Sequence, residues 1–368
     1  MIARRNKTKE IRIGNVKIGG KNPIAIQSMT KVPTKNYREA IAQIQNLEKV
    51  GCAIVRVAVR DEEDAQAIAQ IKSAIRIPLV ADIHFSWKLA LCAVKAGADK
   101  IRLNPGNIYK KEEIKEIVSA ASDYSIPIRV GLNSGSIPRT FRHSQNLSPA
   151  SKLVAAALDY VKLLEDLKFS DIVISLKCSN VLDTIEAYQK ISAKCKYPLH
   201  LGLTATGFSE AGKIKSAVAL GILLSQGIGD TIRVSLTAEP QEEVKIAKYI
   251  LSALSLGNFG PEIISCPACG RTEVDLEKIV NELQEKLSTI NGELLTRPVK
   301  LAVMGCVVNG PGEAEDADLA IAFGKTEGLL YKNSKPIRKV SGAQAVGELI
   351  KEWKKLYVKG EKGKNALV

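Results

Sequence analysis

The sequence predicts an α/β protein made of a (β/α)8 barrel followed by a small α+β domain. Two observations predict the barrel: eight short β-rich runs lie between residues 23 and 236, and amphipathic stretches with helical spacing separate them. Strands that alternate with helices pair in parallel, and eight such units are typical of a closed barrel. The pattern changes after the helical stretch that ends near residue 257, so we expect domains at 1–258 and 259–368.

The eight predicted strands are PIAIQSM (23–29), IVRVAV (54–59), PLVADIH (78–84), KIRLNP (100–105), PIRVGLN (127–133), DIVISLK (171–177), PLHLGLT (198–204) and TIRVSL (231–236). Predicted helices between them include residues 37–51 and 86–97, and residues 240–257 would form the last barrel helix. A doubly wound open sheet is the alternative. The number of strands and the lack of a glycine-rich phosphate fingerprint after the first strand argue against it.

Polar residues interrupt these strands, although parallel strands covered on both faces are normally continuous apolar runs. Alternate residues of a strand share a face, so the polar residues of each strand form a stripe. The stripes pair Asp82 with His84, Arg102 with Asn104, Arg129 with Asn133, Ser175 with Lys177, His200 with Thr204, and Arg233 with Ser235. Because carboxyl ends of barrel strands converge at one mouth, we expect these side chains to surround a common site.

The predicted mouth is strongly basic. Its cations are Arg56, Arg102, Arg129, Lys177 and Arg233, and Asp82 is the acidic candidate within the strand ends. Buried cations need a counter-charge, which carboxylates on the helices or a bound anion could supply. Guanidinium groups suit phosphate oxygens, so we interpret the mouth as a pocket for a phosphate or diphosphate.

The charge balance of the whole chain is also basic. The formal net charge is +14, and much of the excess lies near the two ends, where solvated tails explain it most simply. No aromatic-rich basic stretch of the type used by single-strand binders is present, so we expect no nucleic-acid partner. The charged N-terminus has no apolar signal core and no 18-residue apolar run occurs, so we expect a cytoplasmic protein without membrane contact.

The second domain is predicted from a helix at about 273–288, strands at 296–305, 316–324 and 328–332, and a C-terminal helix at 341–357. Three of the seven cysteines lie in its glycine- and proline-rich turns. Cys266 and Cys269 form a C-x2-C pair, and Cys306 precedes the turn NGPG at 309–312. The other four cysteines lie in or beside apolar stretches and are expected to be buried hydrophobic residues.

The three cysteines indicate a metal or redox site. A C-x2-C turn alone fits zinc, an iron–sulfur cluster or a redox disulfide. A structural zinc site usually needs four Cys or His ligands, and this domain has no histidine and no fourth cysteine. Three thiolates fit a 4Fe–4S cluster with one exchangeable iron, and Glu313 could reach that iron, although it could equally be a surface acid beside Glu315.

Several motifs together resemble the 4-hydroxy-3-methylbut-2-enyl diphosphate synthase family, the iron–sulfur enzymes of the methylerythritol phosphate route to isoprenoids. The resemblance covers residues 10–325 and rests on PIAIQSMT (23–30), VADIHF (80–85), RLNPGNI (102–108), GILLSQGIGDTIRVSL (221–236), CPACGR (266–271) and GCVVNGPGE (305–313). The last motif is far more specific than a lone C-x2-C pair.

The resemblance implies a function for both domains. The barrel would bind 2-C-methyl-D-erythritol 2,4-cyclodiphosphate, and the enzyme would open its ring by two-electron reduction with loss of water. The implied substrate-binding residues are Arg56, Arg102, Arg129, Asn133, Lys177, Arg233 and Ser235, and the implied ligands of the 4Fe–4S cluster are Cys266, Cys269, Cys306 and Glu313. The family also implies ferredoxin or flavodoxin as electron donor and a homodimeric assembly.

One departure from the family pattern concerns proton transfer. After the seventh strand the family reads Leu-Gly-aliphatic-Thr-Glu-Ala-Gly, but this chain has LGLTATG (201–207), with Ala205 at the position of the glutamate. Glu210 lies five residues further on and is a candidate for the missing acid. Otherwise the proton comes from another group, or the activity is impaired.

Two other classes of protein compete with this interpretation. A phosphate-binding barrel of the pterin or phosphosugar type could carry a purely structural cluster. A zinc-ribbon module with basic tails could bind RNA, but it would give the polar stripes of the barrel strands no role.

Overall fold

The computed structural model describes residues 3–142, 146–204, 206–290, 299–308, 310–325 and 327–358. The chain divides into two compact units between Gly257 and Asn258. No helix in these ranges is long and apolar enough to cross a membrane.

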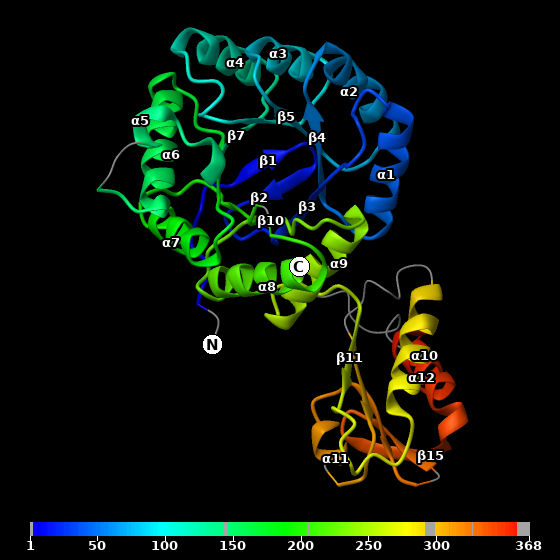
Figure 1. The fold of residues 1–368 in the computed structure, drawn as a ribbon. Coiled ribbons are helices and arrows are strands. Elements are labelled where there is room, and N and C mark those ends of the chain that lie inside the picture. Colours follow the sequence, from blue (N-terminus) through cyan, green and yellow to red (C-terminus); the bar gives the residue numbers. More distant parts are fainter. Residues whose placement is uncertain are drawn as a thin grey trace. The chain divides into compact units, whose positions relative to one another are not determined.

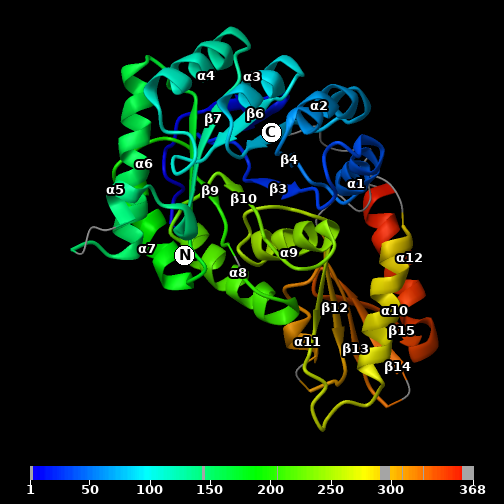
Figure 2. The same cartoon turned by 45° about the horizontal axis from the view of Figure 1, so that its top comes forward.

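The first unit is the predicted barrel, and this fold class is confirmed (Figures 1 and 2). Within the described ranges, eight parallel strands follow the order β8-β7-β6-β5-β4-β3-β10-β9, and a bridge between Ile174 and Leu199 links the two ends. The strands are β3 (Ala25–Met29), β4 (Ile54–Val59), β5 (Leu79–Ile83), β6 (Lys100–Leu103), β7 (Ile128–Asn133), β8 (Ile172–Lys177), β9 (His200–Leu201) and β10 (Thr231–Ile232). All eight coincide with predicted strands, and the last two are much shorter than predicted.

Helices surround the strands (Figure 1). They are α1 (Tyr37–Lys49), α2 (Glu62–Ala74), α3 (Trp87–Lys95), α4 (Lys111–Asp123), α5 (Arg139–Arg142), α6 (Pro149–Asp166), α7 (Val181–Ser192), α8 (Ser209–Ser225) and α9 (Pro240–Ala253). Side chains cap several helix starts: Asp61 accepts a hydrogen bond from the Asp64 amide, and Asn180 accepts one from the Asp183 amide. Such caps satisfy amides that have no partner inside the helix.

A short hairpin closes the amino-terminal end of the barrel. Strands β1 (Ile11–Ile13) and β2 (Val16–Ile18) pair in antiparallel order, and Gly14 adopts φ +54° in the turn. Ile11, Ile13 and Ile18 pack against Ile54 and other inward-facing residues of the barrel strands. The hairpin was not predicted because each of its strands has only three residues. It leaves the opposite mouth, at the carboxyl ends of the strands, for the polar stripes.

The second unit contains a five-stranded sheet in the order β11-β12-β13-β14-β15. Its strands are β11 (Pro261–Ser265), β12 (Val299–Met304), β13 (Leu319–Phe323), β14 (Glu327–Lys332) and β15 (Lys335–Ser341), and its helices are α10 (Leu276–Thr289), α11 (Gly310–Glu313) and α12 (Ala345–Val358). Strand β12 pairs in parallel with β11 and with β13, whereas β14 pairs in antiparallel order with β13 and with β15. Strands β11 and β15 were not predicted. Of the predicted basic C-terminal stretch at 351–364, residues 351–358 belong to α12 and the others lie outside the described residues.

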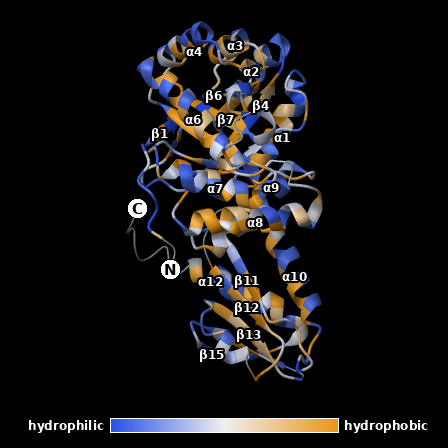
Figure 3. Ribbon diagram, turned by 60° about the vertical axis from the view of Figure 1, so that its left-hand side comes forward, coloured by the Kyte–Doolittle hydropathy of each residue, from blue (hydrophilic) through white to orange (hydrophobic). Residues whose placement is uncertain are grey.

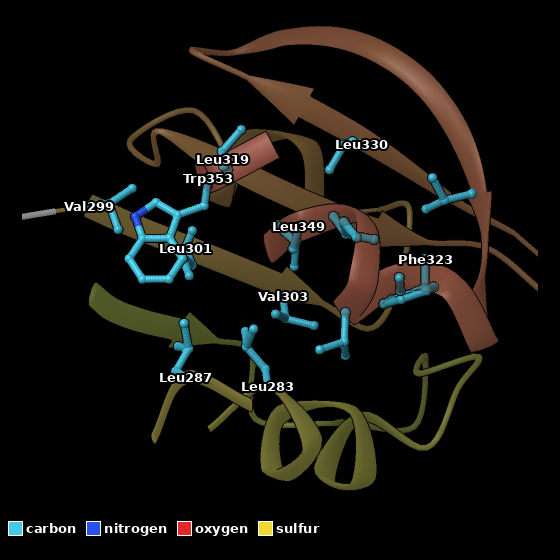
Figure 4. Close-up of a cluster of buried hydrophobic side chains, with 14 of the residues drawn as sticks. Leu283, Leu287, Val299, Leu301, Val303, Leu319, Phe323, Leu330, Leu349 and Trp353 are labelled. Atoms are coloured by element: carbon cyan, nitrogen blue, oxygen red, sulfur yellow. The ribbon is translucent and has the colours of Figure 1, made fainter. Parts of the chain in front are cut away.

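The two faces of this sheet differ. One face packs large side chains, including Leu301, Val303 and Phe323, against Leu283 of α10 and Trp353 of α12 (Figure 4). Figure 3 shows β12 and β13 as largely hydrophobic. The other face carries small residues such as Ala302, Ala320 and Ala322 beside Ala314 and Ala317. The small residues let the segment after β12 lie close to the sheet.

Candidate active site

A polar cavity of about 170 Å³ opens at the carboxyl ends of the barrel strands. Its lining residues are Arg56, Asp82, Arg102, Arg129, Gly131, Asn133, Ser175, Lys177, Leu203, Thr204, Arg233 and Ser235. All seven residues that the sequence nominated for substrate binding are among them. The period of two along each strand explains this convergence, because it turns every second side chain inward at the same end of the barrel.

Asp82 is the counter-ion for one side of the cavity. Its carboxylate lies 2.9 Å from Nη1 of Arg102 and 3.5 Å from Nε of Arg56, and all three side chains are buried. Burial alone would raise the pKa of Asp82, but the neighbouring arginines, Arg102 first among them, hold it well below its usual range. Asp82 is therefore ionised at neutral pH and fixes two guanidinium groups in the wall of the cavity.

Gly131 creates the space that Arg102 occupies. The guanidinium of Arg102 crosses to β7 and donates a hydrogen bond from Nη2 to the Gly131 carbonyl at 2.7 Å. A Cβ atom at Gly131 would lie 2.5 Å from Nε of Arg102. Any side chain there would displace the guanidinium. Gly131 of β7 therefore leaves the space that Arg102 of the neighbouring strand β6 needs.

Arg129 and Lys177 are the least compensated cations of the cavity. Neither forms an ion pair with a carboxylate among the described residues. Burial, and next the charge of Arg56, lower the pKa values of both groups well below their usual ranges. Two cations buried together without a counter-charge favour the entry of an anion, because the anion relieves their mutual repulsion.

Glu243 is a site residue that the sequence analysis missed. It lies in the first turn of α9, only 2 % exposed, and its Oε2 atom lies 3.4 Å from Nη2 of Arg233. The sequence analysis allowed for helix carboxylates as counter-charges in general but named an acidic candidate only within the strand ends, whereas this one comes from the following helix. The sequence PQEEV (240–244) already contained a sign of this role. Glu243 is an acidic residue at a helix position that would normally hold an apolar side chain facing the barrel. Five basic side chains thus line the cavity. Among the described residues, their carboxylate partners are Asp82, which also lines the cavity, and Glu243, which does not line it but pairs with Arg233.

Glu210 does not contribute to this cavity. Its side chain is 74 % exposed on the first turn of α8 and forms an ion pair with Lys213 at 2.9 Å. It is absent from the lining residues, so the structure gives no support to its role as the missing acid. Ala205, which occupies the position of the family glutamate, lies outside the described residues.

His200 belongs to the layer of side chains beneath the cavity. It is fully buried, and its Nδ1 atom lies 2.8 Å from Oγ1 of Thr231. Burial, and next the charge of Lys177, lower its pKa well below the usual range. His200 is therefore a neutral, hydrogen-bonded core residue.

The three cysteines of the second unit lie at the carboxyl ends of two adjacent strands. Cys266 directly follows β11, and Cys306 lies two residues after β12. The Gly305 amide donates a hydrogen bond to Sγ of Cys266 at 3.3 Å, which joins the two strand ends. Cys306 is buried and Cys269 is exposed. A hydrogen bond with the Arg271 backbone, and next one with its side chain, lower the pKa of Cys269 and favour the thiolate.

Glu313 lies at the end of α11, which packs against β12 and β13. A Cβ atom at Gly310 would lie 2.9 Å from Cβ of Ala322 and 3.1 Å from Cβ of Met304. Glycine is therefore required for the close approach of the segment that carries Glu313.

The donor set of this unit fits an iron–sulfur cluster. Among the described residues, no three acidic, cysteine or histidine side chains lie close enough to hold a single metal ion. A cluster binds each ligand to a different iron and so needs a wider spacing than one ion does. Three thiol groups and one carboxyl group, on segments that follow adjacent strands, match such a cluster in the number and chemistry of their donors.

The fold and the two sites indicate a class of protein: a barrel with a cationic cavity at its mouth, joined to a unit with three cysteines near the ends of two adjacent strands. The sequence matches the GcpE TIM-barrel domain over residues 8–248 and the GcpE protein C-terminal domain over residues 262–355. The chain therefore belongs to the GcpE family, which confirms the resemblance found in the sequence.

Curated relatives agree with this assignment. A protein from Caldanaerobacter subterraneus subsp. tengcongensis is 51 % identical over 97 % of this chain and 99 % of its own length. One from Geobacillus kaustophilus is 48 % identical over 100 % of this chain and 98 % of its own length. Both carry the name 4-hydroxy-3-methylbut-2-en-1-yl diphosphate synthase (flavodoxin).

A solved structure shows the same barrel fold. Dihydropteroate synthase from Stenotrophomonas maltophilia aligns with 66 % of this chain and 98 % of its own chain, with a TM-score of 0.50. Its sequence is only 16 % identical, so the likeness concerns the fold alone. The near-complete match to the diphosphate synthases, by contrast, covers both units and disfavours the pterin-type alternative.

Proposed function

We propose that this protein catalyses the reductive ring opening and dehydration of 2-C-methyl-D-erythritol 2,4-cyclodiphosphate to 4-hydroxy-3-methylbut-2-enyl diphosphate. The reaction takes up two electrons and one proton. It breaks a ring C–O bond, whose oxygen stays on the diphosphate, and a second C–O bond, whose hydroxyl oxygen leaves as water. The observation that carries the proposal is the cavity at the barrel mouth, where Asp82 is the one carboxylate that lines the wall with five basic side chains among the described residues. A diphosphate supplies the negative charge that this cavity lacks.

The cations of the cavity would have different roles in binding the diphosphate. Arg129 and Lys177 have no carboxylate partner among the described residues and would contact the diphosphate oxygens directly. Arg56 and Arg102, already oriented by Asp82, would add donors in a fixed geometry. Asn133 and Ser235 line the same cavity and supply neutral hydrogen-bonding groups. Groups held in place before the substrate arrives lose little entropy on binding, which favours both affinity and orientation.

Cys266, Cys269 and Cys306 would hold a 4Fe–4S cluster, with Glu313 as the ligand of its exchangeable iron. When bound there, this group supplies electrons one at a time to the substrate. The relatives are named for flavodoxin, so an acidic carrier of that type, or a ferredoxin, would deliver the electrons. The net charge of +14 supports such a partner, because opposite charges accelerate protein association.

The test is an anaerobic assay with cluster-loaded protein, a chemical reductant and the cyclodiphosphate, followed by mass spectrometry. We expect the linear allylic diphosphate as product. Calorimetry on the cluster-free protein separates binding from chemistry and should show that the cyclodiphosphate binds. Recovery of unchanged cyclodiphosphate from protein with a reduced cluster would contradict the proposed reaction.

The family resemblance also leads us to propose a homodimer. Light scattering on the cluster-loaded protein at several concentrations tests this directly. A mass near twice 39.8 kDa is expected, and a monomer at all concentrations would contradict it.

A further inference from the structure

The barrel has a weak seam between its first and last strands. Strands β3 and β10 pair only through Ala25 with Thr231 and Ile26 with Ile232. Two residues of the cavity lining, Arg233 and Ser235, lie beyond this ladder. The Arg233 amide donates to the Leu201 carbonyl at 2.9 Å, which ties the segment to β9 on its other side. On the side of β3, side-chain contacts rather than backbone pairing must hold the segment that carries Arg233 and Ser235.

The carboxylate of Glu243 spans this seam. It accepts hydrogen bonds from Oγ of Ser28 on β3 and from the Leu236 amide after β10, both at 3.1 Å. Its Oε2 atom, which accepts from Ser28, also lies 3.4 Å from Nη2 of Arg233. One buried carboxylate therefore connects the first strand, the segment after the last strand and a cation of the cavity.

Lys31 reinforces the same connection. Its Nζ atom lies 3.3 Å from Oε1 of Glu243 and donates to the Leu236 carbonyl at 2.7 Å. It also donates to the Ala238 carbonyl. The loop after β3 is thus attached to the loop between β10 and α9 by charged groups, which form stronger hydrogen bonds than neutral ones.

We propose that Glu243 is a positioning residue for diphosphate binding. It does not line the cavity, but it orients Arg233 and fixes the segment that carries Ser235. It also balances the charge of Arg233 while the cavity is empty, as Asp82 does for Arg102 on the opposite side. Without the carboxylate, Arg233 loses its ion pair and the Leu236 amide loses its acceptor. The contacts of Lys31 with the Leu236 and Ala238 carbonyls and the Arg233 amide bond to β9 remain.

The test compares Glu243→Gln with Glu242→Gln in the cluster-loaded protein. Glu242 lies on the same turn, but its carboxylate contacts Lys213 at 3.3 Å rather than the seam. Calorimetry with inorganic pyrophosphate and with the cyclodiphosphate measures affinity, and the reductive assay separates KM from kcat. We expect Glu243→Gln to weaken binding of both anions about tenfold, equal to about 1.4 kcal/mol. KM should rise similarly and kcat should fall less, while Glu242→Gln stays within twofold of the unchanged protein.

A double-mutant cycle separates positioning from a general structural role. The part of the effect that depends on Arg233 is absent from an Arg233→Ala variant, so adding Glu243→Gln there should weaken pyrophosphate binding by less than the tenfold expected in the parent protein. Glu243→Asp, which keeps the charge, should recover part of the lost affinity. Should Glu243→Gln fail to fold, Ser28→Ala removes one of its hydrogen bonds from the side of β3 and should weaken binding two- to threefold.

This inference deepens the proposed function and rests on it, but the two can fail separately. Pyrophosphate binding that depends on Glu243, without turnover of the cyclodiphosphate, would contradict only the proposed reaction. Unchanged binding by folded Glu243→Gln, with normal turnover in the parent protein, would overturn only the role of Glu243. Failure of the parent protein to bind either anion would overturn both.

Discussion

The barrel mouth and the cysteine turns of the second unit represent two ways of building a site. At the mouth, strands hold each cation, and Asp82 and Glu243 fix three arginines through buried ion pairs. In the second unit, the proposed donors lie on segments that follow strands or, for Glu313, at the end of the short helix α11, and Cys269 and Glu313 are exposed. The difference teaches that the barrel site is organised before a ligand arrives, whereas the proposed cluster would fix the final geometry of the cysteine segments.

The largest effect is expected from a cysteine substitution, which should abolish reduction in the second unit but leave anion binding by the barrel intact. Cys306→Ser removes one thiolate and should abolish reduction of the cyclodiphosphate, because a cluster with two thiolate ligands is not retained. Iron analysis and the reductive assay measure the loss. Pyrophosphate binding by the barrel should stay within twofold of the parent protein. Full iron content and activity in this variant would show that the ligand assignment is wrong.

A second substitution tests the barrel cavity without changing the second unit. Lys177→Met keeps much of the side-chain volume but removes a cation that has no carboxylate partner among the described residues. Loss of a charged contact typically costs about 1.5–3 kcal/mol, so affinity for the cyclodiphosphate should fall roughly 10–150-fold. Calorimetry measures this fall, and iron content is the control, which should not change. Unaltered affinity would remove Lys177 from the proposed site.

A third test concerns the stability of the prebuilt mouth and its dependence on pH. The folded state lowers the pKa of Asp82, so its stabilising contribution is present above the unfolded carboxyl pKa of about 3.9 and is lost as pH falls towards the folded value. Asp82→Asn should therefore destabilise the barrel by about 3–5 kcal/mol at pH 7, since it leaves two arginines uncompensated.

Urea unfolding at pH 7 and pH 5 measures this effect. The difference between Asp82→Asn and the parent protein should be the same at both values, because Asp82 is ionised throughout that range. A difference that shrinks between pH 7 and pH 5 would contradict the lowered pKa.

A smaller effect is expected in the second unit. Gly310→Ala places a Cβ atom 2.9 Å from Cβ of Ala322, and such overpacking typically costs about 1–3 kcal/mol. Thermal unfolding should show the loss, and the neighbouring Gly312→Ala is the matched control because a Cβ atom there meets nothing within 4 Å. Equal stability of the two variants would mean that the close approach of α11 to the sheet is wrong.

The smallest effect is expected at Glu210. Its carboxylate is exposed and paired with Lys213, so Glu210→Ala should change kcat by less than twofold. Steady-state kinetics of Glu210→Ala and of the parent protein measure this change in kcat. A loss of more than tenfold would bring Glu210 back as the acid that replaces the glutamate absent at Ala205.

Sequence reasoning predicted the barrel because the strand–helix alternation is regular and each strand has its own polar stripe. It predicted that cations such as Arg129 and Lys177 would converge, since the period of two fixes which side chains face inward. It missed Glu243, because a helix residue can reach the mouth only through tertiary packing that no strand pattern reveals. It also missed β15, whose mostly exposed sequence KPIRKVS lacks an apolar run.

The central claim is that the cationic barrel and the cysteine turns serve one reaction. Electron paramagnetic resonance on anaerobically purified, reduced protein, recorded with and without the cyclodiphosphate, tests it most directly. The account predicts a cluster signal whose shape changes when the cyclodiphosphate is added. It also predicts an unchanged signal for Lys177→Met at a cyclodiphosphate concentration that saturates the parent protein but not this variant. A cluster signal that the bound cyclodiphosphate leaves unaltered in the parent protein would contradict the claim and make the cluster structural.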